Sequence, residues 1–281
     1  MIPTLGSLAP NLPLAVTAVV WLMLVELAKT VRWWSLIGAG RPRFAACLRA
    51  LVAGQVTNQL SPLRAGDAVR IGLFVAQGGG LVSGTAAMAA AKTMDAICLT
   101  TIGALVAGSA ALGQSRLALA GAALVIAACA WLVLAGDRVR GPIGVLERLP
   151  GVRKLRLASL IDVGQALRQP RVLGAVLATT AMVWACGMAA NWAVLAAVGI
   201  APTVDLAARM IVLGYLVGVL PAPPVRLGVV EAGVAAALTS GGVPLADAVA
   251  AGIVFHACQL VELGVLVVAS LALVRRSKLA S

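Results

Sequence analysis

The sequence predicts an all-α, multi-pass membrane protein with about five spanning helices and two re-entrant hairpins of broken helix, arranged as an inverted-topology repeat. Three observations lead to this prediction. The chain of 281 residues is 61% hydrophobic and only 11% charged, which excludes a soluble domain. Several apolar stretches have the length that a helix needs to cross the bilayer. Two further apolar intervals are interrupted by Pro and Gly near their middles.

The apolar stretches that are long enough to span the bilayer as helices are residues 11–31, 83–110, 115–135, 171–198 and 245–274. We expect the first to be a retained helix rather than a signal peptide. Glu26, Lys29 and Arg32 stand where a small-residue cleavage pattern would follow. Residues 1–281 are expected to form a single membrane domain.

The intervals 44–77 and 205–240 are also apolar, but each is broken. The breaks hold Pro62, Gly66, Pro221, Pro223, Pro224 and Gly228. Pro lacks an amide donor and clashes with the preceding turn, so each interval is expected to form two half-helices of about 12 to 17 residues. Because such helices are short for a span, a re-entrant hairpin is the expected arrangement.

Basic residues predict the orientation. They gather in the linker 136–170 with the adjoining Arg171, after the first helix as Arg32, Arg41 and Arg43, and near the end as Arg275, Arg276 and Lys278. These clusters fall on one face if five spans alternate and each hairpin returns to the face that it left. We therefore expect an inner-membrane protein with its N-terminus outside and its C-terminus inside. Basic residues gathered on the cytoplasmic face explain the net charge of +12 better than binding to a nucleic acid does.

Within the linker, apolar residues at helical spacing favour an amphipathic helix on the cytoplasmic surface. A solvated connector is the alternative.

The two broken intervals resemble each other. Residues 62–66 and 224–228 share the pattern Pro-x-Arg-x-Gly at a spacing of 162 residues (224 minus 62). At the same spacing, Gly79 and Gly80 align with Gly241 and Gly242.

This match predicts internal repeats over 11–110 and 171–274, joined by the span 115–135 and the linker 136–170. The first hairpin would open from the cytoplasm and the second from outside, as in transporters built from inverted repeats. The alternative is that Pro and Gly merely end helices.

Ionisable groups inside a membrane are costly, so each needs a partner, water or a ligand. Those expected at depth are Glu26, Arg64, Asp67, Arg70, Lys92, Asp95, Arg226, Glu231, His256 and Glu262. Three pairs at a spacing of i,i+3 can neutralise themselves on one helix face. They are Glu26 with Lys29, Asp67 with Arg70 and Lys92 with Asp95. His256 is either a hydrogen-bonded packing residue or part of a proton relay.

Arg64 and Arg226 are the strongest candidates for binding. Each lies in a break that opens a new half-helix, where amides and the helix dipole favour an anion, and a guanidinium can bind phosphate with two hydrogen bonds. Asp67 and Glu231 would lie in the first turns of those half-helices, where helix capping alone explains a carboxylate equally well.

No catalytic or metal-binding pattern is evident. The cysteines are Cys47, Cys98, Cys129, Cys186 and Cys258, all in apolar segments without metal-ligand spacing, and we interpret them as free buried thiols. Neither a Ser/His/Asp order nor a phosphate-binding Gly loop is present. We therefore expect no enzymatic activity and no cofactor.

The stretches 32–34, 54–70, 92–95, 226–231 and 242–244 resemble the flippase-like family typified by the membrane region of lysylphosphatidylglycerol synthases. The most specific part is Asn-x-x-x-Pro-x-Arg-x-Gly-Asp-x-x-Arg, which begins at Asn58 and adds this residue to the candidate site. The resemblance implies a membrane domain that translocates or binds lipid.

The chain departs from the family pattern in two places. Lys92 stands near an expected acidic residue, and residues 223–226 replace part of a Pro-Gly-Gly-x-Gly pattern. These departures leave the identity of the lipid open.

Our first hypothesis is a flippase for an anionic lipid of the phospholipid or polyprenyl-phosphate type. The second is a lipid-binding scaffold for a partner enzyme, and the third, a polyprenyl-linked glycosyltransferase, would need an aqueous domain for its donor. Faces rich in Gly and Ala are compatible with a homodimer, and equally with packing inside one chain.

Overall fold

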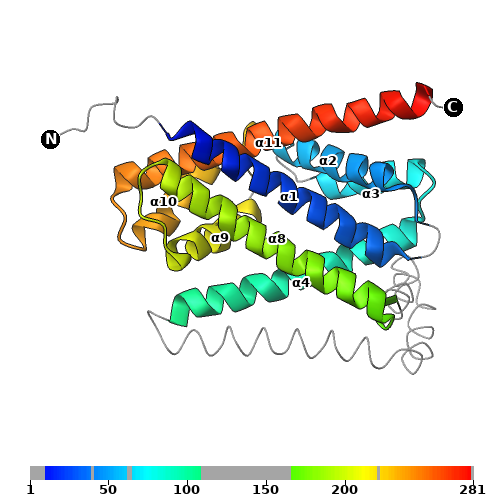
Figure 1. The fold of residues 1–281 in the computed structure, drawn as a ribbon, viewed down its shortest axis with the longest axis horizontal. Coiled ribbons are helices and arrows are strands. Elements are labelled where there is room, and N and C mark those ends of the chain that lie inside the picture. The colour runs from blue at the N-terminus through cyan, green and yellow to red at the C-terminus, as the bar shows by residue number, and fades with distance from the viewer. Residues whose placement is uncertain (1–9, 39–40, 62–64, 109–165, 220–221, 280–281) are drawn as a thin grey trace. The chain divides into compact units, whose positions relative to one another are not determined.

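The computed structural model describes residues 10–38, 41–61, 65–108, 166–219 and 222–279. Within these ranges the chain forms helices and no strand (Figure 1). The predicted span 115–135 and almost all of the linker 136–170 lie outside the described residues. So do the guanidinium of Arg64 and the thiol of Cys129.

The long helices are α1 (Leu12–Ile37), α4 (Leu81–Gly108), α8 (Pro170–Ala197) and α11 (Leu245–Leu279). Each contains 26 or 28 residues that are apolar enough to cross a membrane. They correspond to four of the predicted spans. The all-α, multi-pass membrane fold is therefore confirmed.

The two broken intervals form half-helices, as predicted. The first interval gives α2 (Phe44–Leu60) and α3 (Gly66–Ala76), and the second gives α9 (Val204–Val219) and α10 (Val229–Thr239). These helices contain 17, 11, 16 and 11 residues. A 3-10 turn, η3 (Pro224–Arg226), precedes α10.

The chain divides into two compact units. The first unit comprises residues 1–27, 52–67 and 182–281, and the second comprises 28–51 and 68–181. Each is described separately below.

The core of the first unit is built from small and branched apolar residues on five helices. They include Ala18 of α1, Val194 of α8, Ala207 of α9, Val234 of α10 and Ala251 of α11, all fully buried. The helix α10 packs against both α9 and α11. Small residues allow this close approach, which supplies packing energy where lipid removes the hydrophobic driving force.

The core of the second unit is centred on Trp33 of α1. Its ring is fully buried and lies 5.0 Å from the ring of Phe74 in α3, and its Nε1 donates a hydrogen bond to the carbonyl of Gly84 in α4 at 3.1 Å. The indole therefore fills the core while its N–H group remains paired, as a buried Trp requires.

Gly66 fixes the turn of the first broken interval. Its amide donates to Oδ1 of Asn58 at 3.0 Å, and a Cβ atom at Gly66 would collide with the backbone carbonyl of Gly54. The first residue of α3 thus lies directly against α2, and the absence of a side chain there permits the turn.

We predict that Gly66→Ala lowers the melting temperature in detergent, because the added methyl group displaces α2 at a cost of about 1–3 kcal/mol. Gly72→Ala is the matched control, since it lies in the same helix and its Cβ would meet nothing within 4 Å. Thermal unfolding followed by circular dichroism measures both variants. Equal melting temperatures for the two would contradict the packing described for Gly66.

Candidate functional site

The first unit holds a partly buried acid–imidazole pair. Glu231 lies in the first turn of α10, and His256 lies in the first half of α11. The Nδ1 atom of His256 is 2.8 Å from Oε1 of Glu231, and the two side chains are 3% and 19% exposed. The sequence suggests that His256 is either a hydrogen-bonded packing residue or part of a proton relay, and the structure pairs it with Glu231.

Gly252 brings this pair together. It lies one turn before His256 on α11, and a Cβ atom there would be 2.9 Å from both Cα and the carbonyl oxygen of Glu231. The backbones of α10 and α11 are therefore in direct contact at Glu231, which allows the imidazole to reach the carboxylate.

Arg226 lies in the second break, as predicted, but three residues before the first residue of α10. Its Nη2 donates to the carbonyl of Val217 at 2.9 Å, in the last turn of α9. A cation there also complements the negative end of the helix dipole. The guanidinium thus binds the end of one half-helix rather than opening the next.

The backbone of this break is strained. Val225 and Arg226 have φ values of 59° and 57°, a region that a β-branched residue rarely adopts, and Gly228 follows with φ 79°. If the family pattern Pro-Gly-Gly-x-Gly begins at Pro224, its glycines fall on these three residues. The glycines of the family pattern would then correspond to positions with positive φ, although this chain has Val225 and Arg226 at two of them.

Other candidate residues of the first unit also make contacts across helices. Oε2 of Glu26 accepts a hydrogen bond from Gln55 at 3.1 Å, and Asn58 accepts one from Gly66. Glu262 is buried on α11, while Asp67 is partly exposed in the first turn of α3.

The second unit holds a buried ion pair that sequence analysis did not anticipate. Nη2 of Arg32 donates to Oδ2 of Asp95 at 2.8 Å, and Nη1 donates to Oγ1 of Thr180 at 3.3 Å. Arg32 is only 1% exposed. We had expected Arg32 to follow the first helix in a cytoplasmic cluster, but α1 continues to Ile37 and carries Arg32 inside it.

Asp95, which helical spacing would allow to pair with Lys92, forms an ion pair between α1 and α4, and Lys92 is exposed on α4. Arg70 lies with its guanidinium carbon 4.0 Å from the ring centroid of Trp33, a cation–π contact. Neither Arg32 nor Trp33 was a sequence candidate. A Trp next to an Arg within a long apolar stretch was the available signal.

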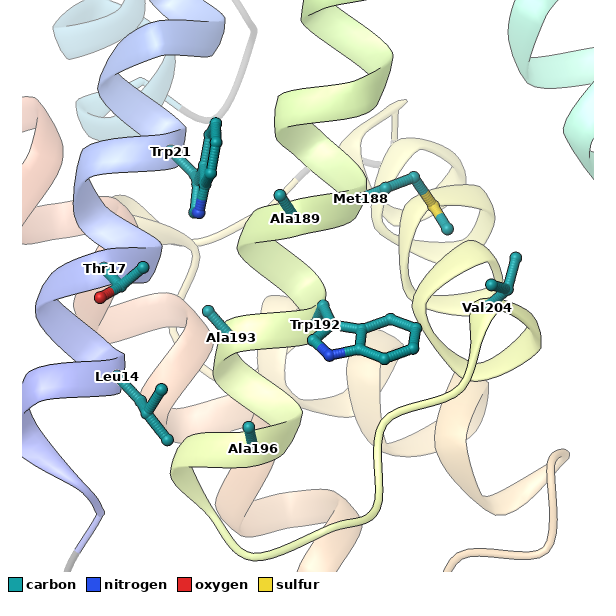
Figure 2. Close-up of a pocket in the computed structure, with 9 residues that line it drawn as sticks. All are labelled: Leu14, Thr17, Trp21, Met188, Ala189, Trp192, Ala193, Ala196 and Val204. Atoms are coloured by element: carbon teal, nitrogen blue, oxygen red, sulfur yellow. The ribbon is translucent and has the colours of Figure 1, made fainter.

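An open apolar groove of about 520 Å³ lies on the first unit (Figure 2). Figure 2 shows side chains of α1 and α8 along its two sides and Val204 of α9 beside them. The lining residues are Leu14, Thr17, Trp21, Met188, Ala189, Trp192, Ala193, Ala196 and Val204. Thr17 is the only hydroxyl among them, and its Oγ1 donates to the carbonyl of Pro13, so the groove offers hydrocarbon contact.

A family model described as the lysylphosphatidylglycerol synthase TM region matches residues 4–268 of the chain. The chain belongs to this family. No curated protein and no solved structure shows significant similarity to it. The chain has four helices long enough to cross a bilayer. Together with its membership in the lysylphosphatidylglycerol synthase TM region family, this supports a lipid-related role in a membrane.

We predict that Asp95→Leu destabilises this family member by about 3 kcal/mol or more, because it buries the Arg32 charge without its counter-ion. Adding Arg32→Met should restore most of the loss, since an apolar pair carries no uncompensated charge. Unfolding in detergent measures the single and double variants.

Asp205→Leu is the control, because it removes a partly exposed i,i+4 pair with Arg209 at 2.6 Å, which is worth less than about 1 kcal/mol. If Asp95→Leu and Asp205→Leu lower the free energy of unfolding equally, burial does not determine how much each ion pair contributes to stability.

Proposed function

We propose that the protein is a flippase of the inner membrane that moves an anionic, phosphate-bearing lipid headgroup between leaflets without changing it chemically. The N-terminus lies outside and the C-terminus inside, and the two broken intervals are hairpins of opposite topology. The observation that carries the proposal is Arg226, held at the break between two half-helices of a protein whose family has a lipid-related role.

The chemistry of Arg226 suits a phosphate. A guanidinium carries five N–H donors in a planar fork, which allows it to hold the carbonyl of Val217 and contact a phosphate oxygen at the same time. The strained backbone of Val225 and Arg226 supports a functional role, because strain of this kind persists mainly at binding and switching sites.

Arg64 occupies the equivalent position of the first break in the predicted repeat, and we propose that it binds the headgroup from the other hairpin. The carboxylates of Asp67 and Glu262 in the first unit would balance its charge, together with Asn58 as a neutral donor and acceptor. In this proposal, rocking of one repeat against the other exposes the headgroup to each face in turn.

The apolar groove of the first unit supports a lipid as the cargo. Its lining of Leu14, Trp21, Met188 and alanines matches a hydrocarbon chain and offers almost no polar partner. A headgroup carried past Arg226 would need such a surface, because the attached acyl chain stays in the hydrocarbon.

Flipping in proteoliposomes tests the proposal. Liposomes carry fluorescent phosphatidylglycerol, fluorescent phosphatidylcholine or a labelled polyprenyl phosphate, and an impermeant reductant bleaches the outer leaflet. We predict that the double change Arg64→Ala and Arg226→Ala lowers the flipping rate of the anionic lipids at least about tenfold, which corresponds to the loss of charge-assisted hydrogen bonds worth about 1.4 kcal/mol in total.

Arg209→Ala is the control, because this arginine pairs with Asp205 near Ser240 and should leave the rate unchanged. Flipping that survives the double change would reject the site. A protein that binds anionic lipid without flipping it would instead be the scaffold for a partner enzyme.

A further inference from the structure

The pair of Glu231 and His256 has a property that lipid binding does not explain. Oε2 of Glu231 and Nε2 of His256 are both buried and have no hydrogen-bond partner among the described residues. His256 is 2% exposed as a whole residue. Buried polar atoms are nearly always paired, so two adjacent exceptions call for an explanation.

The protonation state of the pair determines its net charge. With a neutral imidazole and an ionised carboxylate, Nδ1–H donates to Oε1 and the pair carries one negative charge. One added proton on Nε2 makes the pair an imidazolium–carboxylate ion pair with no net charge. Burial in an apolar surrounding opposes net charge, and one proton on Nε2 removes the net charge of the pair.

Charged groups on the neighbouring elements of the first unit do not replace that proton. Asp205 and Arg209 of α9 pair with each other, Arg226 before α10 binds the carbonyl of Val217, and Glu26 of α1 accepts from Gln55. On α11 itself, Asp247 is exposed and Glu262 is buried, and Asp67 lies in the first turn of α3. Glu231 is the charged group that the structure places against the imidazole within the described chain.

We propose that Glu231 and His256 form a proton-binding site that couples movement of the anionic headgroup to the proton gradient. The inference rests on the proposed flippase function. One proton binds to Nε2 from one side of the membrane, crosses with one headgroup and leaves from Nε2 on the other side. Because the proton offsets the negative charge of the headgroup, the lipid and the proton together move less charge through the membrane potential than the lipid alone.

The position of the pair suits coupling. His256 lies about 17 Å along α11 by helical rise, near the middle of a span, and Glu231 follows the strained break that holds Arg226. The direct contact of Gly252 with the backbone of Glu231 transmits any shift of α10 to the pair. A movement of the broken helix during transport would therefore open or close the path to Nε2.

The proton site is tested without transport by nuclear magnetic resonance of the protein labelled with ¹⁵N-histidine in nanodiscs. The chain has a single histidine, so the spectrum reports His256 alone. Spectra are recorded from about pH 8 to about pH 5. We expect Nδ1 to keep its proton and Nε2 to gain one as the pH is lowered. Glu231→Gln should shift the pH at which Nε2 gains its proton, and Asp247→Asn on the exposed face of α11 should leave that pH unchanged. An Nε2 atom that stays in one protonation state across this range overturns the proposal.

Coupling is tested with the fluorescent phosphatidylglycerol assay under an imposed gradient of about one pH unit, a tenfold proton ratio. We expect the gradient to change the flipping rate of the wild type and of Asp247→Asn several-fold, and to have no effect on His256→Gln. If His256→Gln keeps the gradient response, or if the wild type flips lipid with no response, coupling is rejected while the flippase stands. If the wild type does not flip lipid, the flippase proposal fails and coupling fails with it.

Discussion

Charged side chains in the apolar interior must find partners within each unit, because an uncompensated charge in a low-dielectric surrounding costs several kcal/mol. Glu231 meets His256 in the first unit, and Asp95 meets Arg32 in the second, each at 2.8 Å. Both pairs join residues that are far apart in sequence. They therefore link α10 to α11 and α1 to α4, and a change that separates these helices leaves a charge without its partner.

The same constraint acts on the backbone at the breaks. A half-helix that ends inside the bilayer exposes amides and carbonyls that lipid cannot pair. At the first break the amide of Gly66 binds the side chain of Asn58, and at the second Arg226 binds the carbonyl of Val217. The residues that we propose for lipid recognition thus also hold the breaks together. This dual role links headgroup binding to the geometry of the half-helices, which is what a transport cycle requires.

Features that depend on local chemistry were predictable from the sequence. Pro in the middle of an apolar interval ends a helix, so the breaks and the four described spans followed from composition and spacing alone. The partners of ionisable groups were not predictable, because they depend on helices that meet only after folding. Asp95 was assigned to Lys92 by helical spacing but binds Arg32 across helices. The sequence assigned His256 no partner, and the close approach of the two backbones at Gly252 brings it to Glu231. The inverted repeat stays a prediction.

The opposite entry of the two hairpins is the central claim, and labelling of single cysteines from each face of the membrane tests it most directly. In a background without the five native cysteines, Gln77→Cys at the end of the first hairpin should react with an impermeant maleimide only from the cytoplasmic face. Ser240→Cys at the end of the second, where the serine is exposed, should react only from outside. Labelling of both positions from the same face would contradict the inverted arrangement and the transport cycle built on it.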